Sequence, residues 1–188
     1  MTPSSEQVLR ETQAWLLRAV IGLNLCPFAK AVHTKNQVRY VVSEATDGDT
    51  LLAELCDELN RLATADPNEL DTTLLIHPQV LNDFLDFNDF LGAADEALAQ
   101  LGHEGVLQVA SFHPRFQFAG TGADDVTNAT NRAPYPMLHL LREASINRAV
   151  SAFPRPEAIY ETNMRTLQTL GAEGWAALQA QCKADAAG

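Results

Sequence analysis

The sequence contains 188 residues, of which 46% are hydrophobic and 20% are charged, and its formal net charge is -11 at pH 7. This composition is typical of a soluble globular protein, and no apolar run approaches the roughly 20 residues of a membrane helix. The negative charge argues against nucleic acid as a partner, because phosphate binding needs a basic surface. We therefore expect a soluble protein with neither a nucleic-acid nor a membrane partner.

The N-terminus and the cysteines both indicate the cytoplasm. Polar and charged residues occupy positions where a signal peptide would need an uninterrupted apolar stretch. Cys26, Cys56 and Cys182 are too few and too scattered for a disulfide framework, so reduced thiols are expected.

The length leaves room for one well-buried core, so we expect a single domain over residues 1–188 with frayed ends at residues 1–4 and 183–188. Most of the acidic residues lie between residues 44 and 104, where Arg61 is the one basic residue. They occur at helical spacing opposite leucines, which predicts solvated helix faces.

The predicted elements begin with an amphipathic helix over residues 5–23, where apolar residues recur at spacings of three, four and seven. Residues 38–44 are β-branched and aromatic and predict a strand. The helix that follows is expected to start at a cap on Asp49 or Thr50 and to end near Thr64.

Strands and helices then continue to alternate. Residues 71–78 predict a second strand, an acidic helix follows over roughly residues 79–101, and residues 106–114 predict a third strand. This alternation favours an α/β fold, in which a small, mostly parallel sheet of three or four strands is flanked by helices. An α+β ferredoxin-like arrangement is the alternative.

Two more helices are predicted in the last third of the chain. Residues 136–150 begin with a proline, which suits a first helical turn. A break at FPRP, residues 153–156, precedes a last helical region over residues 157–182, which is interrupted near Gly171 and Gly174.

The polar segment over residues 112–143 is the predicted functional site. It contains histidines, arginines and asparagines around an aspartate pair, and connecting segments with such side chains often carry binding and catalytic groups. The residues expected to bind a small anionic molecule, including one lysine nearer the N-terminus, are Arg115, Asn128, Asn131, Arg132, Tyr135, Arg142 and Lys30.

Two predicted strands end in the same dipeptide, His-Pro. If the strands are parallel, His77 and His113 lie at one carboxyl edge of the sheet with Ser43 and Glu44, where open α/β sheets bind ligands. Histidine suits proton transfer, so we expect His113 to act as a general acid or base, with Asp124 as a second catalytic candidate. The alternative is that proline ends each strand and the histidines have no chemical role.

His139 is the other candidate catalytic histidine. On the helix predicted over residues 136–150, His139, Arg142 and Glu143 share one face because they are three and four positions apart. That face could be an exposed surface, or it could turn toward the preceding loop. The Pro-Tyr-Pro sequence before it would hold Arg132 near a helix N-terminus, which suits carboxylate or phosphate binding.

Cys26 gives a thiol-dependent alternative. A helical turn starting after it, together with Lys30, would favour the thiolate. Its tetrapeptide CPFA also resembles the single-cysteine active site of glutaredoxins and omega-type glutathione transferases, which implies redox or transferase chemistry. A buried and inert cysteine is the other interpretation.

A divalent transition metal such as zinc is a candidate cofactor, with His113, His139 and Cys26 as ligands from separate segments. No spacing motif such as HExxH accompanies them. The glycine-containing sequence AGTGADD is neither a Walker sequence nor a dinucleotide fingerprint, so no nucleotide cofactor is predicted.

The motifs NLCPFAK, SFHPRFQFAG and TNRAPYPMLHLLRE, with an opening helix that contains Trp15, resemble a family of uncharacterised bacterial proteins, a domain of unknown function. The resemblance covers roughly residues 12–150. It implies a bacterial domain and carries no activity, cofactor or catalytic residue.

Three functions are compatible with these patterns. The first is a small-molecule enzyme of undefined reaction that acts on an anionic substrate at the His/Arg-rich site. The second is a protein that binds an anion or metabolite without turning it over. The third is a structural module whose loop residues hydrogen-bond one another, which a filled loop without a cavity would favour.

Overall fold

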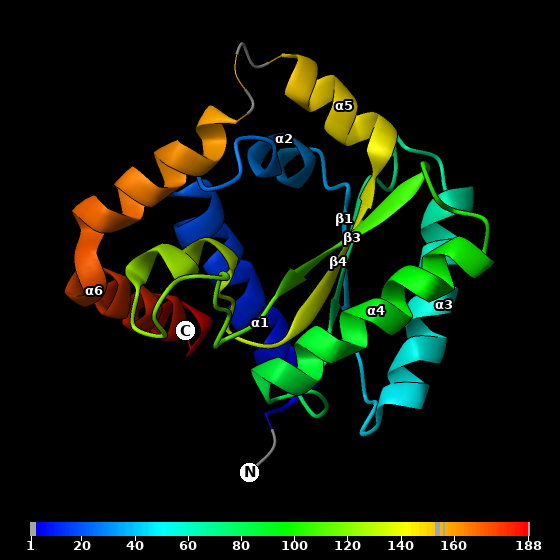
Figure 1. Cartoon of the computed structure of the whole chain (residues 1–188), viewed down its shortest axis with the longest axis horizontal. Coiled ribbons are helices and arrows are strands. Elements are labelled where there is room, and N and C mark those ends of the chain that lie inside the picture. Colours follow the sequence, from blue (N-terminus) through cyan, green and yellow to red (C-terminus); the bar gives the residue numbers. More distant parts are fainter. Residues whose placement is uncertain (1–2, 153–154, 156, 188) are drawn as a thin grey trace.

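The computed structural model describes residues 3–152, 155 and 157–187, and it contains a four-stranded sheet with helices on both faces (Figure 1). In chain order, the helices and strands are α1 (Ser5–Trp15), the π-helix η1 (Leu16–Ile21), α2 (Ala29–Thr34), β1 (Val38–Val42), α3 (Gly48–Thr64), β2 (Thr72–Ile76), α4 (Phe84–Gln100), β3 (Leu107–Phe112), the 3-10 helix η2 (Val126–Asn131), β4 (Met137–Arg142), α5 (Glu143–Ser151) and α6 (Ala158–Ala187). Within these described ranges, no helix has the length and apolar character needed to span a membrane.

The strand order in the sheet is β1-β2-β4-β3. β1 pairs with β2 in parallel, whereas β4 pairs antiparallel with both β2 and β3. β1, β2 and β3 therefore run in one direction, and their carboxyl ends meet at one edge. The predicted α/β class is confirmed. The ferredoxin-like alternative is not found, because α3 and α4 cover one face of the sheet and α1 and α6 cover the other (Figure 1).

The helix predicted over residues 136–150 is wrong in its first half. Residues Met137–Arg142 form β4, and the helix α5 begins only at Glu143. Leucine and methionine suit a helix locally, but β4 occupies an inner position in the sheet and gains backbone hydrogen bonds on both sides. Because side chains alternate along a strand, Leu138 and His139 point to opposite faces.

The other helices differ from the predictions mainly at their ends. The helix predicted over residues 5–23 is present as α1 followed by η1, which ends at Ile21. α3 starts earlier than predicted because its cap is Asp47 rather than Asp49 or Thr50. The carboxylate of Asp47 accepts a hydrogen bond from the backbone N–H of Thr50.

α6 is a long helix with a kink at Gly171, where the backbone leaves helical geometry. Its φ of 71° lies in the left-handed region, which glycine adopts readily, so the predicted interruption there is confirmed. Residues 183–187, which were expected to fray, continue the helix. Most of the predicted FPRP break, at residues 153, 154 and 156, lies outside the described residues.

Two hydrophobic clusters join the sheet to its helices. On one face, α3 and α4 pack against Leu75 and Leu138. On the other face, α1, η1 and α6 pack against Leu74, Ile76 and Met137. Each such fully buried side chain contributes about 1.5–3 kcal/mol of transfer free energy. The whole of β2 is buried as a result, which explains why its apolar residues do not alternate with exposed polar ones.

Candidate functional site

His77 and His113 lie at the same carboxyl edge of the sheet, where the sequence predicts them. The ring of Phe87 on α4 contacts both imidazoles, with ring centroids 5.6 Å from His77 and 5.2 Å from His113. The exposed fractions of the two histidines are 0% and 1%. Beside them, Ser43 is buried and accepts a hydrogen bond from the backbone of Ala45. This edge is a packed aromatic cluster.

Both ring nitrogens of His113 are bonded to the backbone. Nδ1 accepts a hydrogen bond from the N–H of Arg115 at 3.0 Å, so the proton lies on Nε2, which donates to the carbonyl of Leu81 at 3.2 Å. Burial lowers the pKa of His113, which favours this neutral form. Proton transfer by His113 stays a prediction, but its contacts are those of a residue that holds two chain segments together.

His77 is also held in one neutral form. Its Nδ1 lies 3.0 Å from the carbonyl oxygen of Val80 and donates to it, because a carbonyl only accepts. Nε2 then carries a lone pair, and it is buried without a hydrogen bond from any described residue. Burial lowers the pKa of His77 to about 4.

His139 lies on the opposite face of the sheet from His113. The hydroxyl of Thr72 donates to the carbonyl of Leu140 at 2.6 Å, so Nε2–H of His139 donates to the same hydroxyl oxygen at 2.7 Å. The His139 ring packs near Phe112, with centroids 6.0 Å apart, and burial lowers its pKa to about 4. The two candidate catalytic histidines therefore do not face a common space.

Arg142 lies at the other end of β4, far along the strand from the carboxyl edge. Its guanidinium donates to the carbonyl of Ala65 at 2.8 Å and to that of Leu70 at 3.0 and 3.2 Å. It is 8% exposed. The shared helical face predicted for His139, Arg142 and Glu143 is wrong, because the strand sends His139 and Arg142 to opposite sides.

Arg115 and Arg132 bind protein groups at the surface of the polar loop. Arg115 donates to the carboxylate of Asp83 at 3.1 Å, in an exposed ion pair. Arg132 donates to the carbonyls of Phe116, at 3.1 Å, and Ala123, at 2.6 Å, so it joins the two sides of the loop. Both arginines therefore donate to groups of the chain with the N–H groups that were expected to bind an anion.

The two candidate asparagines likewise hold the loop. The carboxamide of Asn128 is buried, accepts a hydrogen bond from the N–H of Phe118 and donates to the carbonyl of Gly122. Asn131 donates to the carbonyl of Ser111 on β3. These contacts fill the interior of the loop with hydrogen bonds.

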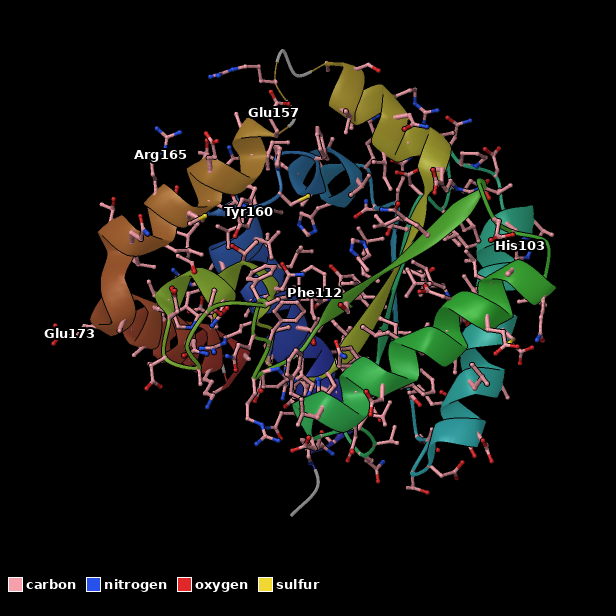
Figure 2. The ribbon with its side chains drawn as sticks, in the orientation of Figure 1. His103, Phe112, Glu157, Tyr160, Arg165 and Glu173 are labelled. Atoms are coloured by element: carbon pink, nitrogen blue, oxygen red, sulfur yellow. The ribbon has the colours of Figure 1, made fainter. Side chains whose placement is uncertain are left out.

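Aromatic rings extend the same packing. Phe84 on α4 contacts Phe116 with centroids 5.3 Å apart, and Phe116 contacts Phe118 at 4.9 Å. Phe118 then meets the edge of Tyr160, which projects from α6 toward the loop (Figure 2), with centroids 6.0 Å apart. The polar loop is thus anchored between α4 and α6.

The remaining sequence candidates are dispersed. Asp124 is exposed, whereas Cys26 is half-buried between η1 and α2 and Lys30 is exposed on α2. Across the described part of the chain, no three histidine, cysteine, aspartate or glutamate side chains are arranged to hold a metal ion. The proposed ligand set of His113, His139 and Cys26 therefore does not fit a shared metal.

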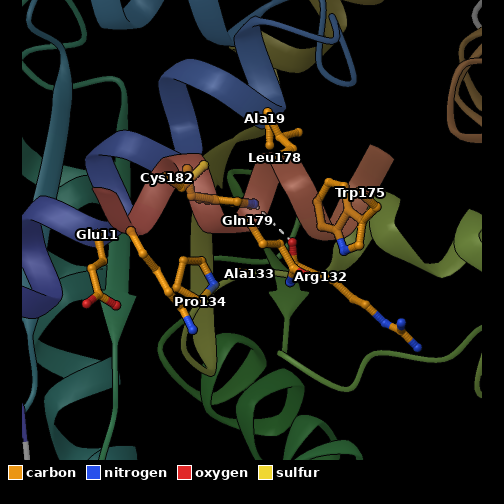
Figure 3. Close-up of a pocket in the computed structure, with 11 residues that line it drawn as sticks. Glu11, Ala19, Arg132, Ala133, Pro134, Trp175, Leu178, Gln179 and Cys182 are labelled. Carbon is orange, nitrogen blue, oxygen red and sulfur yellow. Dashed lines mark hydrogen bonds between the residues drawn. The ribbon is translucent and has the colours of Figure 1, made fainter. Parts of the chain in front are cut away.

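A small groove lies between α1, η1, α6 and the segment after η2 (Figure 3). α1 and η1 contribute every fourth residue from Glu11 through Trp15 to Ala19. The other lining residues, from the segment after η2 and from the second half of α6, are Arg132, Ala133, Pro134, Trp175, Leu178, Gln179, Cys182 and Lys183. Trp175 and Glu11 lie toward opposite ends of the groove (Figure 3).

Hydrogen bonds fix one wall of the groove. The indole N–H of Trp15 donates to the backbone carbonyl of Arg132 at 3.0 Å. The hydroxyl of Tyr135 donates to the carboxylate of Glu11 at 2.8 Å, and burial, followed by this contact, raises the pKa of Tyr135. Two of the predicted binding residues therefore contribute to the groove. Arg132 lines it directly, and Tyr135 holds the lining residue Glu11 in place.

The thiol in the groove is Cys182 rather than Cys26. It is 6% exposed, its Sγ lies 3.8 Å from the carbonyl oxygen of Ala14, and burial raises its pKa. A thiol with a raised pKa is a poor nucleophile at neutral pH.

The residues on α6 were missed by the sequence reasoning. Trp175, Gln179 and Lys183 recur at intervals of four beside the apolar Leu178, so they share one face of the helix. That periodicity was a usable signal. The sequence does not reveal that this face packs against α1, 160 or so residues earlier in the chain.

The fold and the groove together define an α/β protein with a small groove between its helices. The chain belongs to the family described as proteins of unknown function, DUF1415, whose model matches residues 7–177. The resemblance stated from the sequence motifs is confirmed at this level. No curated protein and no solved structure matches the chain.

Proposed function

We propose that this protein binds a small anionic molecule in the groove between α1 and α6 and does not change it chemically. The proposal keeps the anionic ligand expected from the sequence and moves it from the His113 edge to the groove. Its lining combines apolar side chains with the polar groups of Gln179 and Lys183, a combination common in sites that bind small molecules.

The observation that carries the proposal is the indole N–H of Trp175. Trp175 as a residue is 7% exposed, and its N–H makes no hydrogen bond to any residue that the structure describes; the nitrogen itself is not fully buried, so the N–H reaches the surface of the groove. The N–H of Trp15, in contrast, donates to the carbonyl of Arg132. A donor at the groove surface that no acceptor of the described chain occupies is available to a ligand.

Two further donors lie along the same face of α6. The carboxamide of Gln179 and the ammonium group of Lys183 line the groove, and neither has a hydrogen bond or a salt bridge within the described ranges. Exposed lysines are often unpaired, so Lys183 alone would mean little. Its place in one row with Trp175 and Gln179 supports a ligand that carries a negative charge at that end.

Binding is better supported than turnover. In the groove, the carboxylate of Glu11 already accepts hydrogen bonds from Tyr135 and Gln7, and the thiol of Cys182 is buried. At the sheet edge, both nitrogens of His113 are bonded to the backbone. An enzyme that uses His113 would first have to break those bonds.

A panel of small carboxylates and phosphates tests the proposal by thermal shift, followed by analysis of the recovered ligand. Stabilisation by at least one compound is expected, because a ligand that binds only the folded state raises the melting temperature. Lys183→Met should abolish the shift, whereas Lys35→Met, a matched change of an exposed lysine outside the groove, should keep it. Conversion of the compound to a product would replace binding by catalysis, and a shift that survives in Lys183→Met would place the site elsewhere.

The cellular setting belongs to the same proposal. The three cysteines are free, which supports a reducing compartment such as the cytoplasm. A bacterial source is part of this proposal, and its support is the resemblance of the sequence motifs.

A further inference from the structure

We propose that two copies of this chain pair through the edge of β1, antiparallel to each other, and so join their sheets into one continuous sheet. β1 and β3 are the two edge strands, because the strand order is β1-β2-β4-β3. Edge strands present backbone donors and acceptors that another strand can bind. The two edges differ in how far the chain covers them, and this difference identifies β1 as the interface. The pairing does not depend on a ligand in the groove.

The edge of β3 is covered near both of its ends. The N–H of Leu107 donates to the carbonyl of His103, and the carbonyl of Ser111 accepts a hydrogen bond from the carboxamide of Asn131. Both bonds lie on the side of β3 that faces away from β4. Among the described residues, only the middle of the strand around Val109 is free of such contacts, and this stretch is too short for a partner strand.

The edge of β1 is open along its length. The N–H of Ser43 donates to the carbonyl of Ile76, so the odd-numbered residues of this segment direct their backbone groups toward β2. Val38, Tyr40 and Val42 therefore direct their N–H and C=O groups away from the sheet. Within the part of the chain that the structure describes, none of these outward groups has a hydrogen-bond partner. They are available to a second strand.

β1 lacks the features that keep edge strands apart in many proteins. Lysine, proline and bulges commonly serve this purpose, and the sequence Val-Arg-Tyr-Val-Val contains neither lysine nor proline. The charged residue in it, Arg39, is held on α3, where it donates to the carboxylate of Glu58 at 2.8 and 3.0 Å. The guanidinium is thereby neutralised and does not guard the edge. The β-branched and aromatic residues that remain favour strand pairing.

A second copy of β1 fits this edge because an antiparallel pair centred on Tyr40 satisfies all of the outward groups. In that register Tyr40 lies opposite its own counterpart, and Val38 lies opposite Val42 of the partner subunit. Each such pair exchanges two backbone hydrogen bonds. Arg39 then lies opposite Val41 of the partner subunit, so no like charges face each other across the pair. The arrangement is two-fold symmetric, which is the most common symmetry of homo-oligomers.

The charges beside β1 favour this antiparallel direction. Residues 24–39 contain basic residues and no acidic one, whereas residues 44–60 contain acidic residues and no basic one. The chain therefore enters β1 through a basic segment and leaves it through an acidic segment. In an antiparallel pair, the exposed Lys35 of each copy lies beside the acidic end of the other, which includes the exposed Glu44. A parallel pair would align like charges.

Sedimentation velocity over about 1 to 300 µM tests the pairing, because this range covers the affinities of small interfaces. The wild type is expected to form a dimer within it. Val38→Pro should weaken the dimer by about tenfold or more, because proline at the first residue of an edge strand removes an outward donor and no bond to β2. Val109→Pro, the matched change of an outward-facing valine on β3, should leave the affinity unchanged. Circular dichroism shows whether both variants fold.

Exposed charges give a second test that does not involve the strand itself. Glu44→Lys should weaken the dimer by about tenfold or more, and the double variant Lys35→Glu/Glu44→Lys should restore it, because the exchange re-creates opposite charges. If Val38→Pro does not fold, these variants decide the matter. A chain that stays monomeric throughout the range overturns the proposal. It is also overturned by a dimer that Val109→Pro disrupts, by one that withstands Glu44→Lys or a folded Val38→Pro, or by one that the double variant does not restore.

Discussion

The imidazole of His113 stacks on the ring of Phe87, with the two planes inclined by 30° and the centroids 5.2 Å apart. The same phenyl ring contacts His77, so two neutral imidazoles share one apolar partner at the edge of the sheet. A proton on either imidazole would place a charge in this buried cluster. The free energy of unfolding should therefore depend on pH.

Stability is expected to fall as the pH decreases from about 6.5 to about 4. The pKa of His77 is about 4 in the folded chain and near the ordinary value of about 6.5 in the unfolded chain, so only the unfolded state gains a proton in this window. The contribution of His77 is fully present above pH 6.5, and about 3 kcal/mol of it is lost by pH 4. Urea denaturation at intervals of half a pH unit measures the slope.

The control for this prediction is His77→Asn, which keeps a donor for the carbonyl of Val80 at the position of Nδ1 and removes the titrating group. Its free energy of unfolding should change less steeply over the same window. Carboxylates with lowered pKa values, such as Asp47 and Asp125, lose their contribution mainly below pH 4 and so lie outside it. An equal slope in the variant and the wild type would exclude His77 as the source.

His113→Ala is expected to lower the free energy of unfolding by about 3 kcal/mol, because it leaves a cavity and removes the partners of a buried N–H and a buried carbonyl. His103→Ala, which removes one hydrogen bond at the surface, should cost less than about 1 kcal/mol. Chemical denaturation measures both. A His113→Ala protein of normal stability that no longer turns over a substrate would restore the catalytic role predicted from the sequence.

The sequence predicts the strand ends well and the assembly of the site poorly, and the reason is physical. His77 and His113 were placed at one edge because β1, β2 and β3 run in the same direction, a consequence of the helices that connect them. β4 was mistaken for a helix because its preference is set by two neighbouring strands far away in the sequence. Because of this error, His139 and Arg142 were predicted to share one face, whereas the strand places them on opposite sides.

The polar residues show a second limit of sequence reasoning. Arginine and asparagine suit an anion and suit backbone carbonyls equally well, because both roles use the same N–H donors. Arg132, Arg142 and Asn128 all bind carbonyl groups of the chain. The position of the groove depends on contacts between α1 and α6 that no local pattern contains.

Arg132→Met is expected to open the loop over residues 113–125 without unfolding the protein. The substitution removes the donors to the carbonyls of Phe116 and Ala123, while the hydrophobic clusters beneath the sheet keep their contacts. Hydrogen exchange should show at least tenfold faster exchange confined to the loop. Arg115→Met, which removes an exposed ion pair, should change the exchange little, and equal effects of the two substitutions would argue against a special role of Arg132.

The reactivity of the cysteines reports whether the groove is a stable feature of the folded chain. Cys182 is expected to react with iodoacetamide at neutral pH more slowly than Cys56 by a factor on the order of 100 or more. The reason is that burial both covers the thiol of Cys182 and raises its pKa. Cys26 and Cys56 are both half-buried, so their rates should agree within about tenfold. Mass spectrometry of the alkylated peptides gives each rate. Fast modification of Cys182 would mean that α6 separates from α1 often, whereas a Cys26 rate far above that of Cys56 would revive thiol chemistry at the CPFA sequence.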